Sequence, residues 1–315
     1  MNILYRYATI DIGSNSLRFL AVESCADSLY YLDSGIWTVR LAEGMGMGKY
    51  EIKERALERT MVALEEVCHR LDRLSVSLKR RLLFTTESFR SSLNVSDAMG
   101  LIEERAGLKV RILEGWEEAF YSFKGALLGT GLSDPLVFDL GGGSLEISDG
   151  KKGFSLPMGA LRVKNLFGED EEAIKDYVRS GLKGLFEKPS RRESAKSFIG
   201  VGGTSSAAVM ILKKIAVNSY HPSKVHGSMV KVDDIRNLIL ALRKMKPEER
   251  KSVAGLEPGR SDIIVSGLCV IEALLEFFGA SCYFHSECDL LWGLAAEMVE
   301  SREAKKLHDV VWRCR

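Results

Sequence analysis

One glycine-rich turn between two apolar runs most constrains the fold of this chain. Residues 137–147 (VFDLGGGSLEI) run from apolar residues into an aspartate, turn through three glycines and resume as a second apolar run. Glycine has no Cβ, so its backbone can adopt positive φ angles and approach a ligand closely. Consecutive amides in such a turn can cradle an anion. Asp139 and Glu146 flank the turn and suit a bound cation, although a hairpin turn without a ligand has the same pattern.

Two further turns of this type occur in the chain. Residues 7–12 and 17–22 are strand-like and enclose the polar turn Gly13-Ser14-Asn15-Ser16, which predicts a β-hairpin. Residues 198–201 predict a short strand that leads through Gly202-Gly203-Thr204 into a helix, where backbone amides can bind an anion. Each turn alone is also compatible with an ordinary glycine- and serine-containing connection.

An acidic pair lies between a predicted strand and a predicted helix. Residues 109–113 are strand-like and lead through Glu114 to Glu117 and Glu118, followed by the helical segment 119–128. Carboxylates in the first turn of a helix complement its macrodipole, so a structural role is the plain interpretation. A carboxylate at such a junction can also position a water molecule for attack.

The length and composition indicate a folded protein with room for two domains. The chain has 315 residues, and its 44 basic residues nearly balance 43 acidic ones. This net charge of +1 gives no global reason to expect nucleic acid or an anionic membrane as partner. The six cysteines form no Cys-x-x-Cys pair, which argues against a zinc site and a disulfide scaffold. With no signal-peptide pattern and no membrane-length apolar run, we expect a cytoplasmic protein.

Strand-like and helical segments alternate along the chain, which predicts an α/β fold with mixed β-sheets flanked by helices. The clearest predicted helices are residues 51–74, 97–106, 170–186, 205–215, 233–244, 261–278 and 290–308, and residues 188–193 are predicted to form a surface loop. The first turn and the glycine triplet share a weak repeat of strand, aspartate, turn and strand, which predicts two related halves. We place the N-terminal domain at residues 1–120 and the second at 121–315, with the C-terminal helix able to pack back on the first.

These turns, two of them preceded by aspartate, resemble those of the actin-like ATPase superfamily, and ordered motifs narrow the resemblance. The motifs are ATIDIGSNSLRF, TTESFRSSLN, ILEGWEEAF, VFDLGGGSLEIS, SLPMGALRV, GVGGTSSA, KVHGSMV and GLEPGRSDIIVSG. Over almost its whole length the chain resembles the exopolyphosphatase/guanosine pentaphosphate phosphohydrolase (Ppx/GppA) family in its short, two-domain form. The resemblance implies two actin-like (ribonuclease H-like) domains with an interdomain cleft.

The resemblance implies hydrolysis of a terminal phosphoanhydride bond with Mg²⁺ or another divalent cation. Carried over by motif, Glu117 would activate the attacking water, Glu146 would be the second carboxylate, and Arg90 would neutralise the terminal phosphate. The metal-side acids would be Asp11, Asp139 and Glu146. The implied phosphate-binding residues are Gly13, Ser14, Asn15, Ser16, Gly142, Gly143, Ser144, Gly202, Gly203 and Thr204. Such a set suits a highly charged substrate, which needs amide cradles, a cation and a positioned carboxylate.

The chain departs from the family pattern at three places. Phe120 stands where arginine is usual, and Leu145 stands where threonine is usual before the second glutamate. Residues 289–293 lack the usual arginine and glutamate. A missing arginine could weaken the binding of one phosphate or alter specificity, but it leaves the proposed base and both hairpin loops in place. We interpret His226, in the KVHG segment, as a neutral structural histidine rather than a catalytic one.

The preferred interpretation is a magnesium-dependent exopolyphosphatase in which each half contributes one phosphate loop. The alternatives are a guanosine pentaphosphate 5′-phosphohydrolase with the same chemistry, a kinase that shares the scaffold, and a catalytically weak regulator that binds polyphosphate or nucleotide. The expected partner is therefore inorganic polyphosphate or guanosine pentaphosphate, with no nucleic acid and no membrane, and a homodimer is possible.

Overall fold

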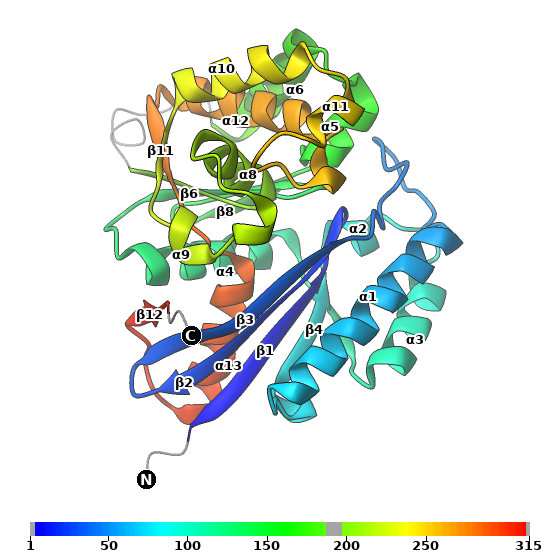
Figure 1. Cartoon of the computed structure of the whole chain (residues 1–315), viewed down its shortest axis with the longest axis vertical. Coiled ribbons are helices and arrows are strands. Elements are labelled where there is room, and N and C mark those ends of the chain that lie inside the picture. The colour runs from blue at the N-terminus through cyan, green and yellow to red at the C-terminus, as the bar shows by residue number, and fades with distance from the viewer. Residues whose placement is uncertain (1–3, 187–196, 313–315) are drawn as a thin grey trace. The chain divides into compact units, whose positions relative to one another are not determined.

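A computed structural model describes residues 4–186 and 197–312 of the chain. The contacts within the chain divide it into two units. Figure 1 shows the chain coloured by residue number. Unit 1 comprises Met1–Gly131 and Cys288–Arg315, and unit 2 comprises Leu132–Glu287. The surface loop predicted at residues 188–193 lies outside the described residues. Within the described ranges, none of the helices combines the length and the hydropathy that a membrane crossing needs.

Unit 1 is built on a six-stranded mixed sheet with the order β12-β3-β2-β1-β4-β5. The strands are β1 (Tyr5–Ile12), β2 (Ser16–Cys25), β3 (Ser28–Thr38), β4 (Arg81–Thr85), β5 (Val110–Ile112) and β12 (Asp309–Val311). The first three strands pair antiparallel, whereas β4 and β5 continue the sheet parallel to β1. The predicted hairpin is thus confirmed, and β12 adds the C-terminal segment to the outer edge of β3.

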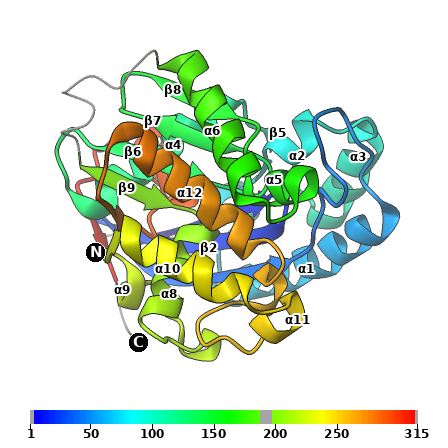
Figure 2. The same ribbon diagram turned by 90° about the horizontal axis from the view of Figure 1, so that it is seen from above.

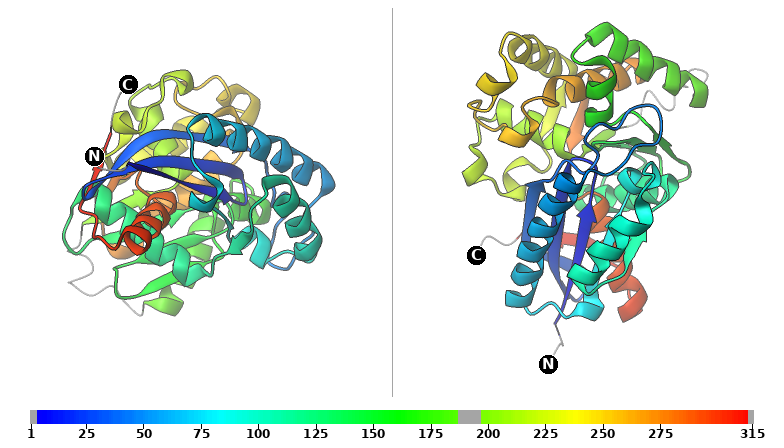
Figure 3. Two further views of the ribbon diagram at one scale, coloured as in Figure 1. Left: turned by 90° about the horizontal axis from the view of Figure 1, so that it is seen from below. Right: turned by 90° about the vertical axis from the view of Figure 1, so that its right-hand side faces the viewer.

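Helices cover both faces of this sheet. They are α1 (Glu54–Arg73), the 3₁₀ turn Leu78–Arg80, α2 (Glu87–Arg90), α3 (Val95–Ala106), α4 (Gly115–Thr130) and α13 (Leu290–Glu303). Figure 3 shows α1 and α13 on opposite faces. The buried residues of α1 recur every three or four positions, as expected for one apolar stripe facing the sheet; they are Ala56, Thr60, Ala63, Leu64, Val67 and Leu71.

Unit 2 contains a second six-stranded mixed sheet with the order β10-β11-β9-β6-β7-β8. Its strands are β6 (Leu136–Leu140), β7 (Leu145–Ser148), β8 (Gly153–Leu156), β9 (Phe198–Val201), β10 (Met229–Lys231) and β11 (Cys282–His285). Its helices and 3₁₀ turns are α5 (Ala160–Phe167), α6 (Glu171–Leu185), α8 (Gly203–Leu212), Val217–Ser219, α9 (Pro222–Val225), α10 (Val232–Arg243), α11 (Pro247–Arg250), Pro258–Arg260 and α12 (Ile264–Phe278).

The two sheets repeat one topology. In unit 1 the order β3-β2-β1-β4-β5 has the same pairing directions as the order β8-β7-β6-β9-β11 in unit 2. The remaining strands, β12 and β10, extend opposite edges of this shared pattern. The predicted fold class of two α/β units with mixed sheets flanked by helices is confirmed, and the weak sequence repeat corresponds to a structural one.

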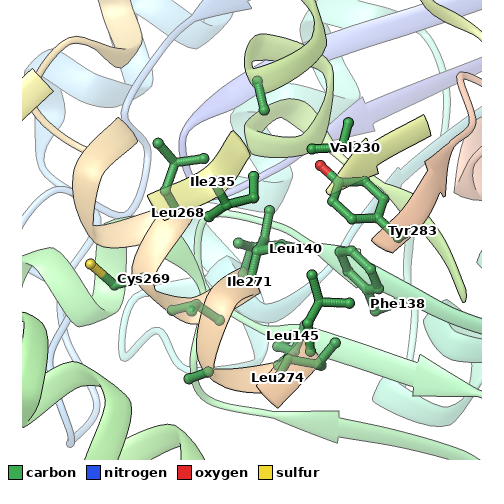
Figure 4. Close-up of a cluster of buried hydrophobic side chains, with 14 of the residues drawn as sticks. Phe138, Leu140, Leu145, Val230, Ile235, Leu268, Cys269, Ile271, Leu274 and Tyr283 are labelled. Atoms are coloured by element: carbon green, nitrogen blue, oxygen red, sulfur yellow. The ribbon is translucent and has the colours of Figure 1, made fainter. Parts of the chain in front are cut away.

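The core of unit 2 forms around α12. This helix is apolar on most of its surface, and it lies between α6 and α10 in Figure 2. In Figure 4 its residues Leu268, Ile271 and Leu274 lie beside Leu140 and Leu145 of the sheet. These side chains are at most 1% exposed, so the two strands that enclose the glycine triplet are anchored in a well-packed core.

The core of unit 1 depends on a close contact between α4 and α13. A Cβ on Gly125 of α4 would lie 2.1 Å from the Asp289 carbonyl oxygen, and one on Gly293 would lie 1.9 Å from that of Tyr121. Glycine at both positions lets the two backbones approach. Helix α4 is continuous through residue 120, where the sequence analysis placed the domain border, and the observed division follows Gly131.

This contact predicts that Gly125→Ala destabilises unit 1. The added methyl group overlaps a backbone oxygen that cannot rotate away, so we expect a loss of about 1–3 kcal/mol in the free energy of unfolding. Gly100→Ala in α3 is the matched control, because nothing lies within 4 Å of its added Cβ and alanine favours a helix interior. Urea unfolding should separate the two variants; equal midpoints would contradict the close contact.

Candidate active site

The first hairpin loop is a closed turn between β1 and β2. The Gly13 N–H donates to the Ser16 carbonyl oxygen at 3.1 Å. The Ser14 carbonyl accepts from Ala42 N–H, and the Asn15 carbonyl accepts from the two amides of residues 39 and 40, all at 2.9–3.0 Å. Among the described residues, no hydrogen bond is donated by the backbone amides of Ser14 and Asn15. The loop therefore has its carbonyl groups engaged and two amides available for an anion.

Asp11 lies at the end of β1, directly before this loop. Its side chain is buried, and Oδ2 accepts from Arg18 Nη2 at 2.7 Å. Arg18 also forms an ion pair with Asp289. The Oδ1 atom is buried and has no hydrogen-bond partner among the described residues, and the same holds for Asn15 Oδ1. Burial raises the pKa of the Asp11 carboxyl, and the neighbouring Arg18 opposes that rise.

Arg90 lies at the end of α2, on the segment that follows β4. This segment is tied to the first loop because Thr85 Oγ1 donates to the Ile12 carbonyl at 2.8 Å. The Arg90 guanidinium donates to Glu87 Oε2 at 3.0 Å and also binds the Leu113 carbonyl and the Glu118 carboxylate. The structure thus joins Arg90, predicted to bind the terminal phosphate, to the acidic pair at the start of α4.

The two glutamates of that pair have different environments. Glu117 is the third residue of α4, and its Oε2 accepts from the Glu114 N–H at 2.9 Å in a capping box, while Oε1 pairs with Arg111. Glu118 is 5% exposed and pairs with Arg90. Glu117 was the predicted base, and no separate role was predicted for Glu118. The position of Glu117 was the available clue to the difference, because a glutamate at the third position of a helix commonly caps the helix start.

The second hairpin loop repeats the closure of the first. The Gly141 N–H donates to the Ser144 carbonyl at 3.1 Å, as Gly13 does to Ser16. Asp139 on β6 lies opposite Glu146 on β7, the same position in which Asp11 lies opposite Arg18 in unit 1. Glu146 is 3% exposed and accepts from Ser155 Oγ at 2.6 Å. The structure thus brings together two of the predicted metal-side acids within unit 2.

The start of α5 supports this loop from behind. The carbonyls of Gly141 and Gly142 both accept from amides of α5 at 2.9 Å, and Arg162 Nε donates to the Gly143 carbonyl at 2.9 Å. Arg162 is 3% exposed, so its positive charge is buried beside the loop. In the described part of the chain, the amides of Gly142 and Gly143 donate no hydrogen bond. Neither α5 nor the role of Arg162 was predicted from the sequence.

The third loop lies beside the second. Strands β6 and β9 are parallel neighbours, with Asp139 opposite Val201. Gly202 has a φ angle of +91°, and a Cβ there would lie 2.6 Å from the Leu140 carbonyl oxygen and 2.8 Å from Asp139 Oδ1. A Cβ on Gly203 would overlap the Arg260 guanidinium. Gly202 is therefore required by its positive φ angle and its close backbone contact, whereas a side chain at Gly203 would displace the flexible end of Arg260. Arg260, for which no role was predicted, thus lies at the loop.

The departures from the family pattern fall partly in the cores. Leu145 is 1% exposed and packs in the core of unit 2, and Trp292 is 3% exposed in the core of unit 1. Phe120 is 45% exposed on α4. The apolar residues at 145 and 292 thus serve packing, while nothing in the structure explains the aromatic residue at 120.

The acidic residues of the loops offer carboxylates that could bind a metal ion. Within residues 4–186 and 197–312, no group of three or more His, Cys, Asp and Glu side chains is arranged to hold a metal ion by itself. Magnesium in phosphoryl-transfer sites needs only one or two carboxylates, because water and substrate phosphates complete its coordination. In unit 1 the unpartnered Oδ1 of Asp11, and separately in unit 2 the Asp139–Glu146 pair, each match such a partial ligand set.

Known proteins match the chain over nearly its whole length. The bifunctional 3-dehydroquinate synthase/phosphatase of Fusobacterium nucleatum subsp. nucleatum is 32% identical over 321 residues, covering 94% of this chain. The chain spans about half of that relative, 47% of its length. Exopolyphosphatase 2 of Mycobacterium tuberculosis is 27% identical over 323 residues, covering 94% of this chain and 99% of the relative.

Solved structures share the fold. An exopolyphosphatase from Cytophaga hutchinsonii has a TM-score of 0.82 at 23% identity, covering 94% of this chain and 98% of that one. A Ppx/GppA family member from Aquifex aeolicus has a TM-score of 0.72 at 23% identity, covering 95% and 99%. The sequence profile of the Ppx/GppA phosphatase family matches residues 21–302. The chain therefore belongs to the Ppx/GppA phosphatase family, whose members are hydrolases that act on phosphoanhydride bonds.

Proposed function

We propose that the protein is an exopolyphosphatase that releases terminal orthophosphate from inorganic polyphosphate. The observation that carries this proposal is the paired hairpin loops, one in each unit, whose carbonyl groups are engaged from behind while two amides in each remain available. Such loops can bind phosphate oxygens through their backbone amides. The family membership and the exopolyphosphatase named among the relatives support the same conclusion.

In the proposed reaction, water attacks the terminal phosphorus atom as its bond to the bridging oxygen breaks. A carboxylate accepts a proton from the water, orthophosphate leaves, and the bridging oxygen becomes the new end of a chain that is one phosphate shorter. The amides and hydroxyls of residues 13–16, 142–144 and 202–204 bind phosphate oxygens, and Arg90 neutralises the charge that the terminal group carries. In this proposal, most of the rate acceleration comes from positioning the reactants and from stabilising the charge of the transition state.

The acidic pair supplies the base in this proposal. Resemblance assigns that role to Glu117, but both oxygens of Glu117 serve the helix start and Arg111. Glu118 is buried and contacts Arg90, the residue proposed to bind the terminal phosphate. We therefore propose that Glu118, rather than Glu117, accepts the proton, with Glu146 as the second carboxylate.

Glutamine variants at the two positions separate these assignments. Glu118→Gln should lower kcat about 100-fold or more, because an amide cannot accept the proton. Glu117→Gln should keep kcat within a few-fold and lower the stability by at most about 1 kcal/mol, because glutamine can still cap the helix and only the ion pair with Arg111 is lost. Steady-state kinetics and urea unfolding of both variants measure these effects. If Glu117→Gln loses activity and Glu118→Gln retains it, the base is Glu117.

A divalent cation would supply positive charge to the phosphate oxygens when it is bound. The carboxylates proposed to contribute ligand atoms are Asp11 in unit 1 and Asp139 and Glu146 in unit 2. The buried and unpartnered Oδ1 of Asp11 supports the first assignment, because a buried carboxylate oxygen without a donor is costly unless a cation or water binds it.

Removal of the cation with a chelator should abolish phosphate release, and added Mg²⁺ should restore it. Asp11→Asn should raise the Mg²⁺ concentration needed for half-maximal activity by about tenfold, the loss of one charged ligand. Asp33→Asn is the matched control, because Asp33 also pairs with an arginine of unit 1, Arg70, yet belongs to none of the loops. Equal magnesium requirements in the two variants would remove Asp11 from the proposed ligand set.

Substrate preference tests the proposed function itself. Orthophosphate release should have the highest kcat/KM with polyphosphate, lower values with guanosine pentaphosphate, and no dependence on ADP as acceptor. A higher kcat/KM for guanosine pentaphosphate would make the protein a nucleotide phosphohydrolase. Transfer to ADP would indicate a kinase, and tight binding of polyphosphate without release would indicate a regulator.

A further inference from the structure

A polar network of buried and partly buried side chains adjoins the start of α8, where the third loop ends. His285, at the end of β11, is 1% exposed. Its Nδ1 lies 2.8 Å from Ser205 Oγ, and its Nε2 lies 2.8 Å from Glu287 Oε1. Nε2 donates to the Glu287 carboxylate, and Nδ1 forms a hydrogen bond with the serine hydroxyl. The imidazole therefore joins Glu287 to the first turn of α8.

Glu287 gathers further donors around the same carboxylate. Ser206 Oγ donates to Oε1 and Tyr220 Oη donates to Oε2, each at 2.7 Å. The Glu287 backbone N–H donates to His226 Nδ1 at 3.1 Å. Burial raises the pKa of Glu287, but the hydrogen bonds to His285, Tyr220 and Ser206 outweigh it and hold the pKa at about 2. The carboxylate is thus ionised at neutral pH.

The residue types match those of a serine–histidine–glutamate hydrolase, but the geometry excludes that chemistry. Ser205 is fully buried, so no substrate carbonyl or phosphorus atom can reach its hydroxyl. The hydroxyl also contacts Tyr283 Oη at 3.2 Å within the core of unit 2. The network is therefore a fixed support rather than a second catalytic site.

The network holds both ends of the third loop. On one side, the Ser286 N–H donates to the Gly200 carbonyl of β9 at 2.9 Å. On the other side, Ser205 and Ser206 follow Gly202–Thr204 directly and bind His285 and Glu287. A loop with two glycines has little conformational preference of its own, so its shape depends on such contacts.

We infer that Glu287 is a positioning residue that, through Ser206 and His285, fixes the third loop in the shape that binds a substrate phosphate. This role rests on the proposed function of that loop. Because the loop contacts phosphate in the ground state and the transition state alike, a displaced loop should weaken substrate binding more than turnover.

Two hydroxyl deletions around Glu287 test this inference. Ser206→Ala and Tyr220→Phe each remove one donor at 2.7 Å from the same carboxylate, but only Ser206 lies on α8. We expect Ser206→Ala to raise KM for tripolyphosphate about fivefold to tenfold with kcat nearly unchanged, the size of one lost charged hydrogen bond. Tyr220→Phe should leave both constants within twofold. Hydrogen exchange in a peptide covering residues 202–206 should accelerate in Ser206→Ala only.

The outcomes separate the two proposals. If the wild type hydrolyses tripolyphosphate but both variants show equal KM and equal exchange, the positioning role is overturned and the proposed function stands. If Ser206→Ala lowers kcat without changing KM, the positioning role is likewise overturned. If the wild type neither binds nor hydrolyses tripolyphosphate, the proposed function fails, and the inferred role in phosphate binding fails with it.

Discussion

The hydrogen bonds that hold the carbonyl oxygens of each hairpin loop from behind are the constraint on which the proposed site depends. In unit 1 these bonds come from residues 39–42, and in unit 2 they come from the start of α5 and from Arg162. A peptide unit whose carbonyl is engaged cannot turn over, so its amide is fixed as well. Short antiparallel strands alone would allow many turn shapes. The second segment selects the one that leaves amides for an anion.

Duplication of the sheet topology does not duplicate the chemistry. Asp11 and Asp139 occupy equivalent positions before their loops, but Asp11 faces Arg18 across the hairpin whereas Asp139 faces Glu146. Asp11 is therefore paired across its hairpin with an arginine, whereas Asp139 has a second acid opposite it. The two units accordingly contribute different groups to the proposed reaction. The base belongs to unit 1, and the second carboxylate belongs to unit 2. In unit 2, Arg260 and the polar network around His285 make additional contacts beside the third loop. These contacts have no counterpart among the described residues of unit 1.

Local patterns in the sequence predicted the hairpins, the loops and most helices, because alternation, glycine turns and helical periodicity are local signals. Contacts that join distant segments were not predictable in this way. The parallel pairing of β12 with β3 and the support from Arg162 depend on tertiary packing. The domain border was predicted at residue 120, which lies inside α4, because no composition shift marks the division that follows this helix. The different environments of Glu117 and Glu118 likewise arise from packing, which adjacent identical residues cannot reveal.

The central claim is that water attacks the terminal phosphorus of polyphosphate. Hydrolysis of a defined polyphosphate in ¹⁸O-labelled water, followed by ³¹P NMR and mass spectrometry, tests it most directly. The account predicts orthophosphate carrying one labelled oxygen and remaining chains shortened one unit at a time. Fragments of intermediate length, or phosphate transferred to another acceptor without label, would contradict the account.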